Sequence, residues 1–82
     1  MAKVFQVGIY SFDQTLFEGE AISLSVPSVS GYLGVLADHS PLVARLGRGK
    51  ITIRTRQGKT SIIDSSAGGF LQVLQNQATL LL

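Results

Sequence analysis

The chain has 82 residues, of which 45% are hydrophobic and 15% are charged, and its formal net charge is +2 at pH 7. This composition is too apolar and too weakly charged for a disordered chain, so residues 1–82 are predicted to form one small domain. No apolar run approaches the roughly 20 residues that cross a bilayer, and the N-terminus lacks a signal-peptide pattern. The absence of cysteine excludes disulfide bonds.

Apolar and polar residues alternate in four segments of the chain, at residues 5–9, 21–26, 50–56 and 70–74. A period of two is typical of half-buried strands in antiparallel sheets. The residues that this pattern predicts to face the core are Phe5, Val7, Ile9, Ile22, Leu24, Val26, Ile51 and Ile53. In the last segment Phe70, Gln72 and Leu74 lie on one face of the strand, and Leu71 and Val73 lie on the other.

Turn-forming residues separate these segments at short intervals, which is typical of a sandwich or a barrel. Gln57-Gly58, between two basic-flanked strands, is predicted to be the tip of a hairpin. No long segment carries the apolar stripe of a helix. The fold class is therefore predicted as all-β, an antiparallel β-sandwich or flattened barrel.

Residues 31–44 combine two glycines, the only histidine and a proline with apolar residues. Gly31 and Gly34 are expected to allow backbone angles or close approaches that a side chain would block. Pro41 removes a backbone donor and favours an extended conformation at the residue before it. We predict a strand, a tight corner that presents residues 38–40, and a second strand.

Two segments leave alternatives open. Residues 38–46 could form one helical turn capped by Asp38, although the residues after Pro41 favour a strand. Gly68-Gly69 could mark a bulge or a bend where a strand changes sheet. The functional alternative for these two glycines is a flat backbone patch against which another subunit packs.

The charges are unevenly distributed along the chain. Four of the five acidic residues lie in the first half, and six of the seven basic residues lie between positions 45 and 59. This asymmetry could steer a charged partner. The alternative is a solvated strand face, because long basic side chains also protect exposed strands from pairing.

No residue pattern for catalysis occurs in the chain. His39 is flanked by Asp38 and Ser40, but neighbouring side chains in a turn point apart and do not form a relay. One histidine without cysteine excludes a credible metal site, and no phosphate-binding loop is present. Residues 45–59 contain no aromatic side chain on which nucleic-acid bases could stack. We therefore predict a non-enzymatic interaction module without cofactor or metal.

Four blocks of the sequence resemble one family in collinear order: residues 16–21, 26–27, 31–44 and 67–73. The third block is similar to the signature of the epsilon subunit of F-type ATP synthases, which is called delta in mitochondria. That signature reads Gly-x-Leu/Ile-Gly-Val/Ile-Leu, two turn residues, then His-Ala/Ser-Pro-Leu.

The resemblance implies a β-sandwich of about ten short strands at the foot of the central stalk. In the family this domain binds the gamma subunit and rests on the c-ring, so that ion-driven rotation is coupled to ATP synthesis without catalysis by the domain itself. It implies membrane association only through these partners, on the cytoplasmic face of a bacterial inner membrane or the equivalent organellar face. No nucleic acid is expected as a partner.

Position by position, the resemblance implies two interfaces. The expected contacts with the c-ring and the rotor base are Gly31, Tyr32, Asp38, His39 and Ser40. The expected contacts with gamma are Ser11, Val43, Ala44, Gly68, Gly69 and Phe70.

This chain also departs from the family pattern. Tyr32 stands where relatives commonly carry an acid, and Ala37-Asp38 stands where they often have Pro-Gly. The charge of Asp38 could replace the missing acid. The sequence ends where the last sandwich strand should end, so the family's C-terminal helical hairpin is not expected, and no inhibitory role or nucleotide site is inferred. The alternatives are an unrelated β-sandwich or barrel adaptor and a weak binder of single-stranded nucleic acid.

Overall fold

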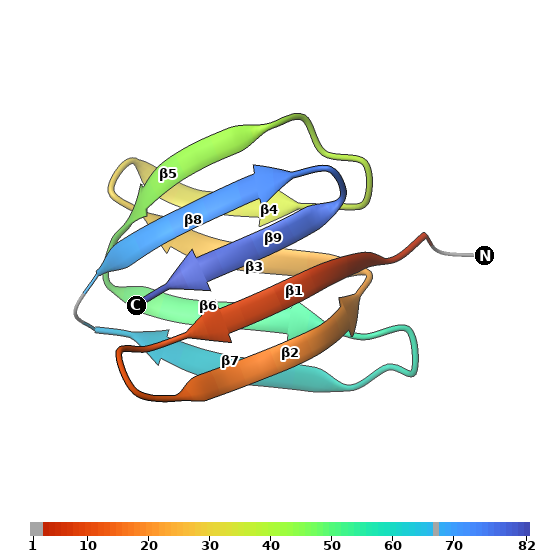
Figure 1. The fold of residues 1–82 in the computed structure, drawn as a ribbon, viewed down its shortest axis with the longest axis horizontal. Coiled ribbons are helices and arrows are strands. Elements are labelled where there is room, and N and C mark those ends of the chain that lie inside the picture. The colour runs from red at the N-terminus through yellow and green to blue at the C-terminus, as the bar shows by residue number, and fades with distance from the viewer. Residues whose placement is uncertain (1–2, 67) are drawn as a thin grey trace.

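The computed structural model describes residues 3–66 and 68–82, in which nine β-strands occur and no helix (Figure 1). The all-β prediction is thus confirmed, with one strand fewer than the ten that the resemblance implies. The strands are β1 (Phe5–Tyr10), β2 (Thr15–Ala21), β3 (Ser23–Ser28), β4 (Gly31–Val35), β5 (Leu42–Leu46), β6 (Gly49–Arg54), β7 (Thr60–Ser65), β8 (Gly69–Leu74) and β9 (Gln77–Leu81).

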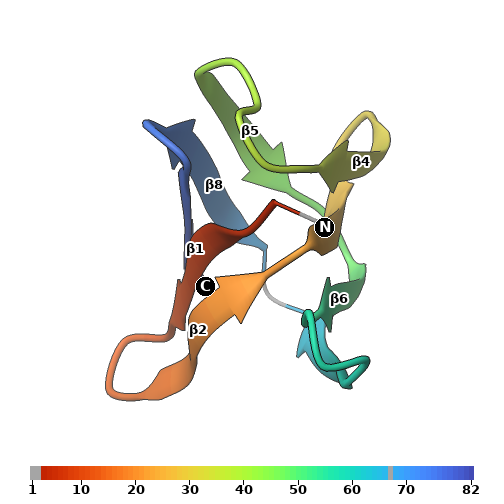
Figure 2. The same ribbon diagram turned by 90° about the vertical axis from the view of Figure 1, so that its right-hand side faces the viewer.

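The strands form two layers that enclose the core (Figure 2). One layer has five strands in the order β2-β1-β9-β8-β5, and the other has four in the order β4-β3-β6-β7. The layers join at a corner where Ser28 of β3 pairs with Leu46 of β5. The molecule is therefore a β-sandwich whose sheets are continuous at one side, as in a flattened barrel.

One pair of strands departs from the predicted antiparallel arrangement. β1 and β9 run parallel, with Gln6 opposite Gln77 and Tyr10 opposite Leu81, whereas the other paired strands of the described residues are antiparallel. Parallel neighbours need a long connection. Here almost the whole chain lies between the two strands, so the pair closes the fold by joining its first and last strands.

The chain passes from one layer to the other at Ile22, at residues 36–41, at Gly47-Arg48 and between Ser65 and Gly69. The expectation of a bend at Gly68-Gly69, where a strand changes sheet, is confirmed. No bulge occurs there, since the irregular register of the structure lies between Ile9 and Tyr10. Ala67, which belongs to the fourth resembling block, lies outside the described residues.

The core is built by the inward side of the alternating pattern. Seven of the eight residues predicted to face inward are buried, and Ile22 is half-buried because it lies at a crossing between the layers. In the last segment Leu71 and Val73 are the buried face. The core also contains apolar side chains that the alternation did not assign to it. They are Ala21, Val35, Leu46, Ala78 and Leu80. In the described part of the chain, no helix has the length and apolar character that spanning a membrane requires.

Residues 31–46 fold as the predicted strand, corner and strand, without a helical turn. Gly31 has a positive φ of 120°, which confirms the expectation of a backbone conformation that glycine adopts more easily than other residues. The expectation for Gly34 is wrong, because it has no positive φ and a Cβ there would meet open space. The predicted hairpin tip at Gln57-Gly58 is confirmed between β6 and β7.

Candidate interaction surfaces

The two corners that were expected to share one interface lie at opposite ends of the sandwich (Figure 1). At one end, which we call the glycine end, Gly31 pairs with Ser28, and the neighbouring Leu46 pairs with Gly69. The whole length of β4 then carries the chain to the other end, where Asp38 meets Asn76. The structure therefore brings Gly31 and Tyr32 together but separates them from residues 38–40.

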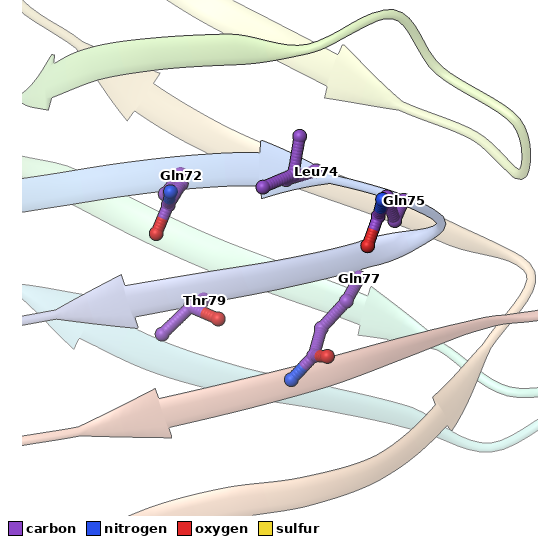
Figure 3. A pocket seen from close by; sticks show the side chains of 5 residues that line it. All are labelled: Gln72, Leu74, Gln75, Gln77 and Thr79. Carbon is purple, nitrogen blue, oxygen red and sulfur yellow. The ribbon is translucent and has the colours of Figure 1, made fainter.

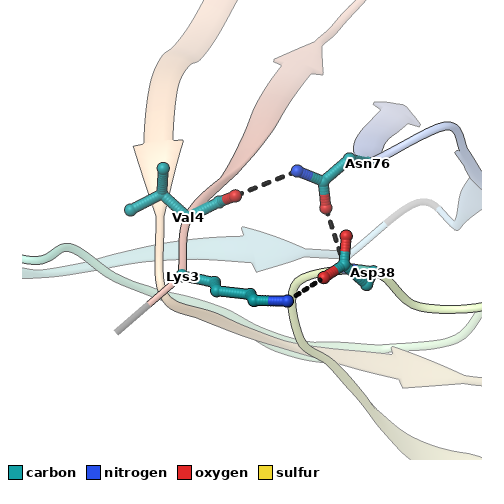
Figure 4. A network of polar contacts seen from close by, with 4 residues as sticks. All are labelled: Lys3, Val4, Asp38 and Asn76. Carbon is teal, nitrogen blue, oxygen red and sulfur yellow. Dashed lines mark hydrogen bonds and ion pairs between the residues drawn. The ribbon is translucent and has the colours of Figure 1, made fainter. Parts of the chain in front are cut away.

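We call the second end the clip end, because a network of polar contacts joins three segments there (Figure 4). The Lys3 Nζ donates to Asp38 Oδ2 at 2.9 Å, and the backbone N–H of Asp38 donates to Asn76 Oδ1 at 2.8 Å. Asn76 Nδ2 in turn donates to the carbonyl of Val4 at 3.0 Å. The clip end is defined by these four residues, of which sequence reasoning had singled out only Asp38.

The charges of the clip end are exposed and paired. The hydrogen bond to Asp38, helped by the attraction of its carboxylate, raises the pKa of Lys3. Because both side chains are largely in water, the ion pair adds little to the stability of the domain. The charge of Asp38, which could have replaced a missing acid one corner away, thus has an intramolecular partner.

His39 follows this network and is half-buried. Its Nδ1 lies 2.7 Å from the carbonyl oxygen of Ser40. A carbonyl only accepts hydrogen bonds, so Nδ1 carries the hydrogen and Nε2 remains for another contact. No nucleophile or acid completes a catalytic set here, and the described residues contain no cluster of three His, Cys, Asp or Glu side chains that could hold a metal ion.

At the glycine end Tyr32 makes a contact within the chain. The backbone N–H of Lys50 donates to its hydroxyl at 3.0 Å, and the ring lies against Gly49, where a Cβ would collide with the hydroxyl and with Pro27. Tyr32 thus fastens the β3–β4 hairpin to the start of β6, although 61% of it is exposed. It also brings one aromatic ring next to the basic segment, a neighbour that the sequence did not reveal.

The residues expected to contact gamma mostly gather on the outer face of the five-stranded sheet and at its end. Val43 on β5 and Phe70 on β8 point outward and are 71% and 53% exposed. Ala44 lies on the inner side, because alternate residues of a strand face opposite ways. Gly68 and Gly69 precede Phe70, and Ser11 follows β1 at the same end of the sheet.

Two further apolar side chains on this face were missed by sequence reasoning. Leu81 of β9, 55% exposed, lies opposite both Phe70 and Tyr10, and Leu74 of β8 is 46% exposed. We call the four side chains Val43, Phe70, Leu74 and Leu81 the outer apolar patch. The alternation of residues 70–74 placed Phe70 and Leu74 on the same face of the strand, but only the pairing of β8 with β9 adds Leu81.

A shallow hollow lies next to this patch, on the β8–β9 hairpin (Figure 3). Its lining is uncharged and consists of Gln72, Leu74, Gln75, Gln77 and Thr79. Amide and hydroxyl groups both donate and accept hydrogen bonds, but they do not transfer protons at neutral pH. The hollow therefore offers hydrogen-bonding groups and no ionisable side chain.

A polar pair on the neighbouring strands β1 and β2 lines a second hollow. The Tyr10 hydroxyl donates to Glu18 Oε2 at 2.7 Å, and the ring lies over Gly8. The hydrogen bond to Glu18, together with burial and the negative charge of the carboxylate, raises the pKa of Tyr10. The pair fixes the outward ring of Tyr10 beside Leu81, its partner in the parallel ladder.

Comparison with known proteins places this fold in a family. The profile of the family described as ATP synthase, Delta/Epsilon chain, beta-sandwich domain matches residues 4–82. An ATP synthase epsilon chain of Dichelobacter nodosus is 37% identical over 81 residues, which are 99% of this chain and 56% of that protein. One of Leptospira interrogans is 38% identical over 80 residues, 98% of this chain and 61% of that protein. The chain thus spans little more than half the length of these relatives.

Solved structures have the same fold. A chain of the Euglena gracilis mitochondrial ATP synthase, determined as an OSCP/F1/c-ring assembly, superposes with a TM-score of 0.86 at 22% identity and covers 99% of this chain and 51% of that one. A chain of the central stalk and c-ring of the Tetrahymena thermophila mitochondrial ATP synthase gives 0.76 at 12% identity, covering 93% and 60%. The family match over residues 4–82, on a nine-stranded sandwich, shows that this chain belongs to the ATP synthase delta/epsilon chain family and forms its β-sandwich domain.

Proposed function

We propose that this chain is the rotor-binding domain of a central-stalk subunit of an F-type ATP synthase. It binds gamma through the outer face of the five-stranded sheet and touches the c-ring at the glycine end, so that it transmits rotation without catalysing a reaction. The observation that carries this proposal is the outer apolar patch, exposed on a sandwich of a family whose similar members are named ATP synthase epsilon chain.

The composition of the patch suits a protein partner. Interfaces are depleted of charge at their centre and enriched in aromatic residues, and the outward side chains of β8 and β9 include Phe70 and carry no charge. Charges lie at the margins, with Arg45 opposite Phe70 on β5 and Glu18 beyond β1 on β2. Phe70 is the natural anchor, since large aromatic side chains dominate binding energy at interfaces.

Because the two corners lie at opposite ends of the sandwich, we assign them to different partners. Tyr32 stands where the family resemblance places the residue that meets the ring loops, so we assign the glycine end to the c-ring. The corner at residues 38–40 then meets the base of gamma with the free nitrogen of His39. In this arrangement the domain is peripheral and reaches the membrane only through its partners.

The decisive experiment is binding of the chain to purified gamma and to detergent-solubilised c-ring. Phe70→Asp should weaken binding to gamma at least about tenfold, because it buries a charge at the centre of the interface. Ile62→Asp is the matched control: Ile62 is 58% exposed on β7 of the other sheet and should leave binding to gamma unchanged. Equal affinities of the two variants, or no binding of the unmodified chain, would contradict the proposal.

A further inference from the structure

Two residues that are not glycine adopt the left-handed backbone conformation and bind each other across the clip end. Asp38 has φ of 62° and Asn76 has φ of 61°, and the N–H of the first donates to the side chain of the second. This conformation is unfavourable for residues with a Cβ, although aspartate and asparagine tolerate it best. Two such residues in direct contact indicate that the surrounding structure holds both of them in place.

The side chain of Asn76 uses both ends of its amide. Oδ1 accepts from Asp38 and Nδ2 donates to the carbonyl of Val4, while the backbone carbonyl of Asn76 accepts from the N–H of Gln6 at 3.1 Å. One residue of the β8–β9 turn thus connects the corner after β4 with the N-terminal arm. Its neighbour Gln75 shares the left-handed conformation, with φ of 50°, but makes no side-chain hydrogen bond within the described residues.

The corner after β4 depends on these contacts. Outside the strand ladders, the hydrogen bonds that join residues 36–41 to other described segments are both made by Asp38, one with Asn76 and one with Lys3. The bond to Lys3 is an exposed ion pair that water and salt weaken. The neutral bond to Asn76 does not depend on salt, so it is the one that fixes the corner.

We infer that Asn76 is a positioning residue, which holds residues 38–40 and the N-terminal arm in one arrangement and thereby sets the direction of the His39 ring. The consequence for binding rests on the function proposed above, in which this corner meets gamma. The inference about the corner itself concerns the free chain and can be tested without any partner.

The test is amide hydrogen exchange measured by NMR on the labelled chain. Asn76→Gly keeps the left-handed backbone without strain and removes the side chain, so the Asp38 amide should exchange at least about tenfold faster and the His39 ring signals should shift. Gln75→Gly is the matched control. It places glycine at the adjacent left-handed position, where the replaced side chain makes no hydrogen bond. In that variant the exchange of Asp38 should stay unchanged.

A conservative variant distinguishes loss of the contact with Asp38 from a general loosening of the domain. Asn76→Asp keeps an oxygen acceptor for the Asp38 amide and loses the donor to Val4, so it should retain most of the protection of Asp38. The buried amides of β8 should exchange at the wild-type rate in all three variants. Unchanged exchange of Asp38 in Asn76→Gly, or equal acceleration in Gln75→Gly, would overturn the inference.

Binding to purified gamma provides the second readout. If the corner meets gamma, Asn76→Gly should weaken binding several-fold, and Asn76→Asp should recover part of the affinity. If the unmodified chain does not bind gamma, the proposed function fails, whereas the exchange experiment still decides the role of Asn76. The two failures are therefore distinguishable.

Discussion

The two ends of the sandwich hold their connecting segments in place by different interactions. At the glycine end the chain crosses between layers, and side chains are absent where backbones meet, as at Gly47 and Gly69. At the clip end the chain crosses between layers at residues 36–41, and polar contacts of Asp38 and Asn76 hold segments that do not pair as strands. Close backbone contacts at glycines thus distinguish one end, and a network of side-chain hydrogen bonds distinguishes the other.

The two ends should therefore respond differently to substitution. Steric exclusion between backbones cannot relax without moving a strand, so an added methyl group at the glycine end should be costly. Exposed hydrogen bonds compete with water and each contributes little net stability, so changes at the clip end should alter order more than stability. The predictions below test this difference, from the largest expected effect to the smallest.

Gly69→Ala should destabilise the domain most. A Cβ at this position would overlap the carbonyl oxygen of Leu81 in β9 and lie 3.0 Å from the carbonyl carbon, and φ is 138°. We expect a loss of about 3 kcal/mol or more, since both the neighbouring backbone and the local conformation resist the change. Urea unfolding measures it, with Gly34→Ala as the control that meets open space. Equal midpoints for the two variants would refute the steric account of the glycine end.

Gly49→Ala should have a smaller effect, about 1–2 kcal/mol. Its Cβ would meet the end of the Tyr32 side chain, which can move away, but also Pro27 Cβ at 2.9 Å, which cannot. In a double-mutant cycle Tyr32→Ala should relieve part of this cost, and Tyr32→Phe should relieve less of it, because it removes only the hydroxyl. A cycle with strictly additive effects would show that Tyr32 does not cover Gly49.

Substitutions of Asp38 should separate backbone conformation from charge at the clip end. Asp38→Ala keeps the N–H that donates to Asn76, but alanine tolerates the left-handed conformation poorly, so we expect a loss of about 1 kcal/mol. Asp38→Gly removes the same carboxylate without that conformational cost and should be close to neutral. Thermal unfolding of both variants checks this, and equal losses would mean that the ion pair with Lys3 dominates instead.

The smallest effect should appear only at high pH, on the outer face beside β9. Because the folded-state pKa of Tyr10 is raised above its ordinary value of 10.0, the interaction with Glu18 is fully present below that value. Its stabilising contribution should be lost as pH rises through the folded-state pKa. In a Tyr32→Phe background, phenolate absorbance should show Tyr10 titrating at lower pH after Glu18→Ala. An unchanged titration would rule out the hydrogen bond to Glu18.

Much of the fold follows from local patterns. Alternation identified four strand segments and the inward residues of three of them, and turn chemistry located the β6–β7 hairpin and the corner at residues 38–40. The parallel pairing of β1 with β9 could not be predicted, because a period of two has the same appearance in both orientations and the two strands are the most distant in the chain.

The candidate surfaces were predictable only in part. Val43 and Phe70, which the resemblance assigns to the gamma interface, are exposed, whereas Ala44, assigned to the same interface, lies on the inner side of β5. In the sequence Asn76 is only a polar residue that follows an alternating segment, and nothing local shows that its amide reaches the corner after β4. Its left-handed neighbour Gln75, which makes no such contact, would have given the same signal.

By itself the sequence determined the all-β class, most of the inward residues and the family, because all three depend on the spacing of apolar, glycine and proline residues over short stretches. The tertiary structure alone decided that Tyr32 and His39 lie at opposite ends, that Leu81 joins the outer apolar patch and that Asn76 holds the His39 corner. These features depend on which strands become neighbours. Strand pairing is chosen by burial and closure of the whole domain, so no local stretch of sequence contains it.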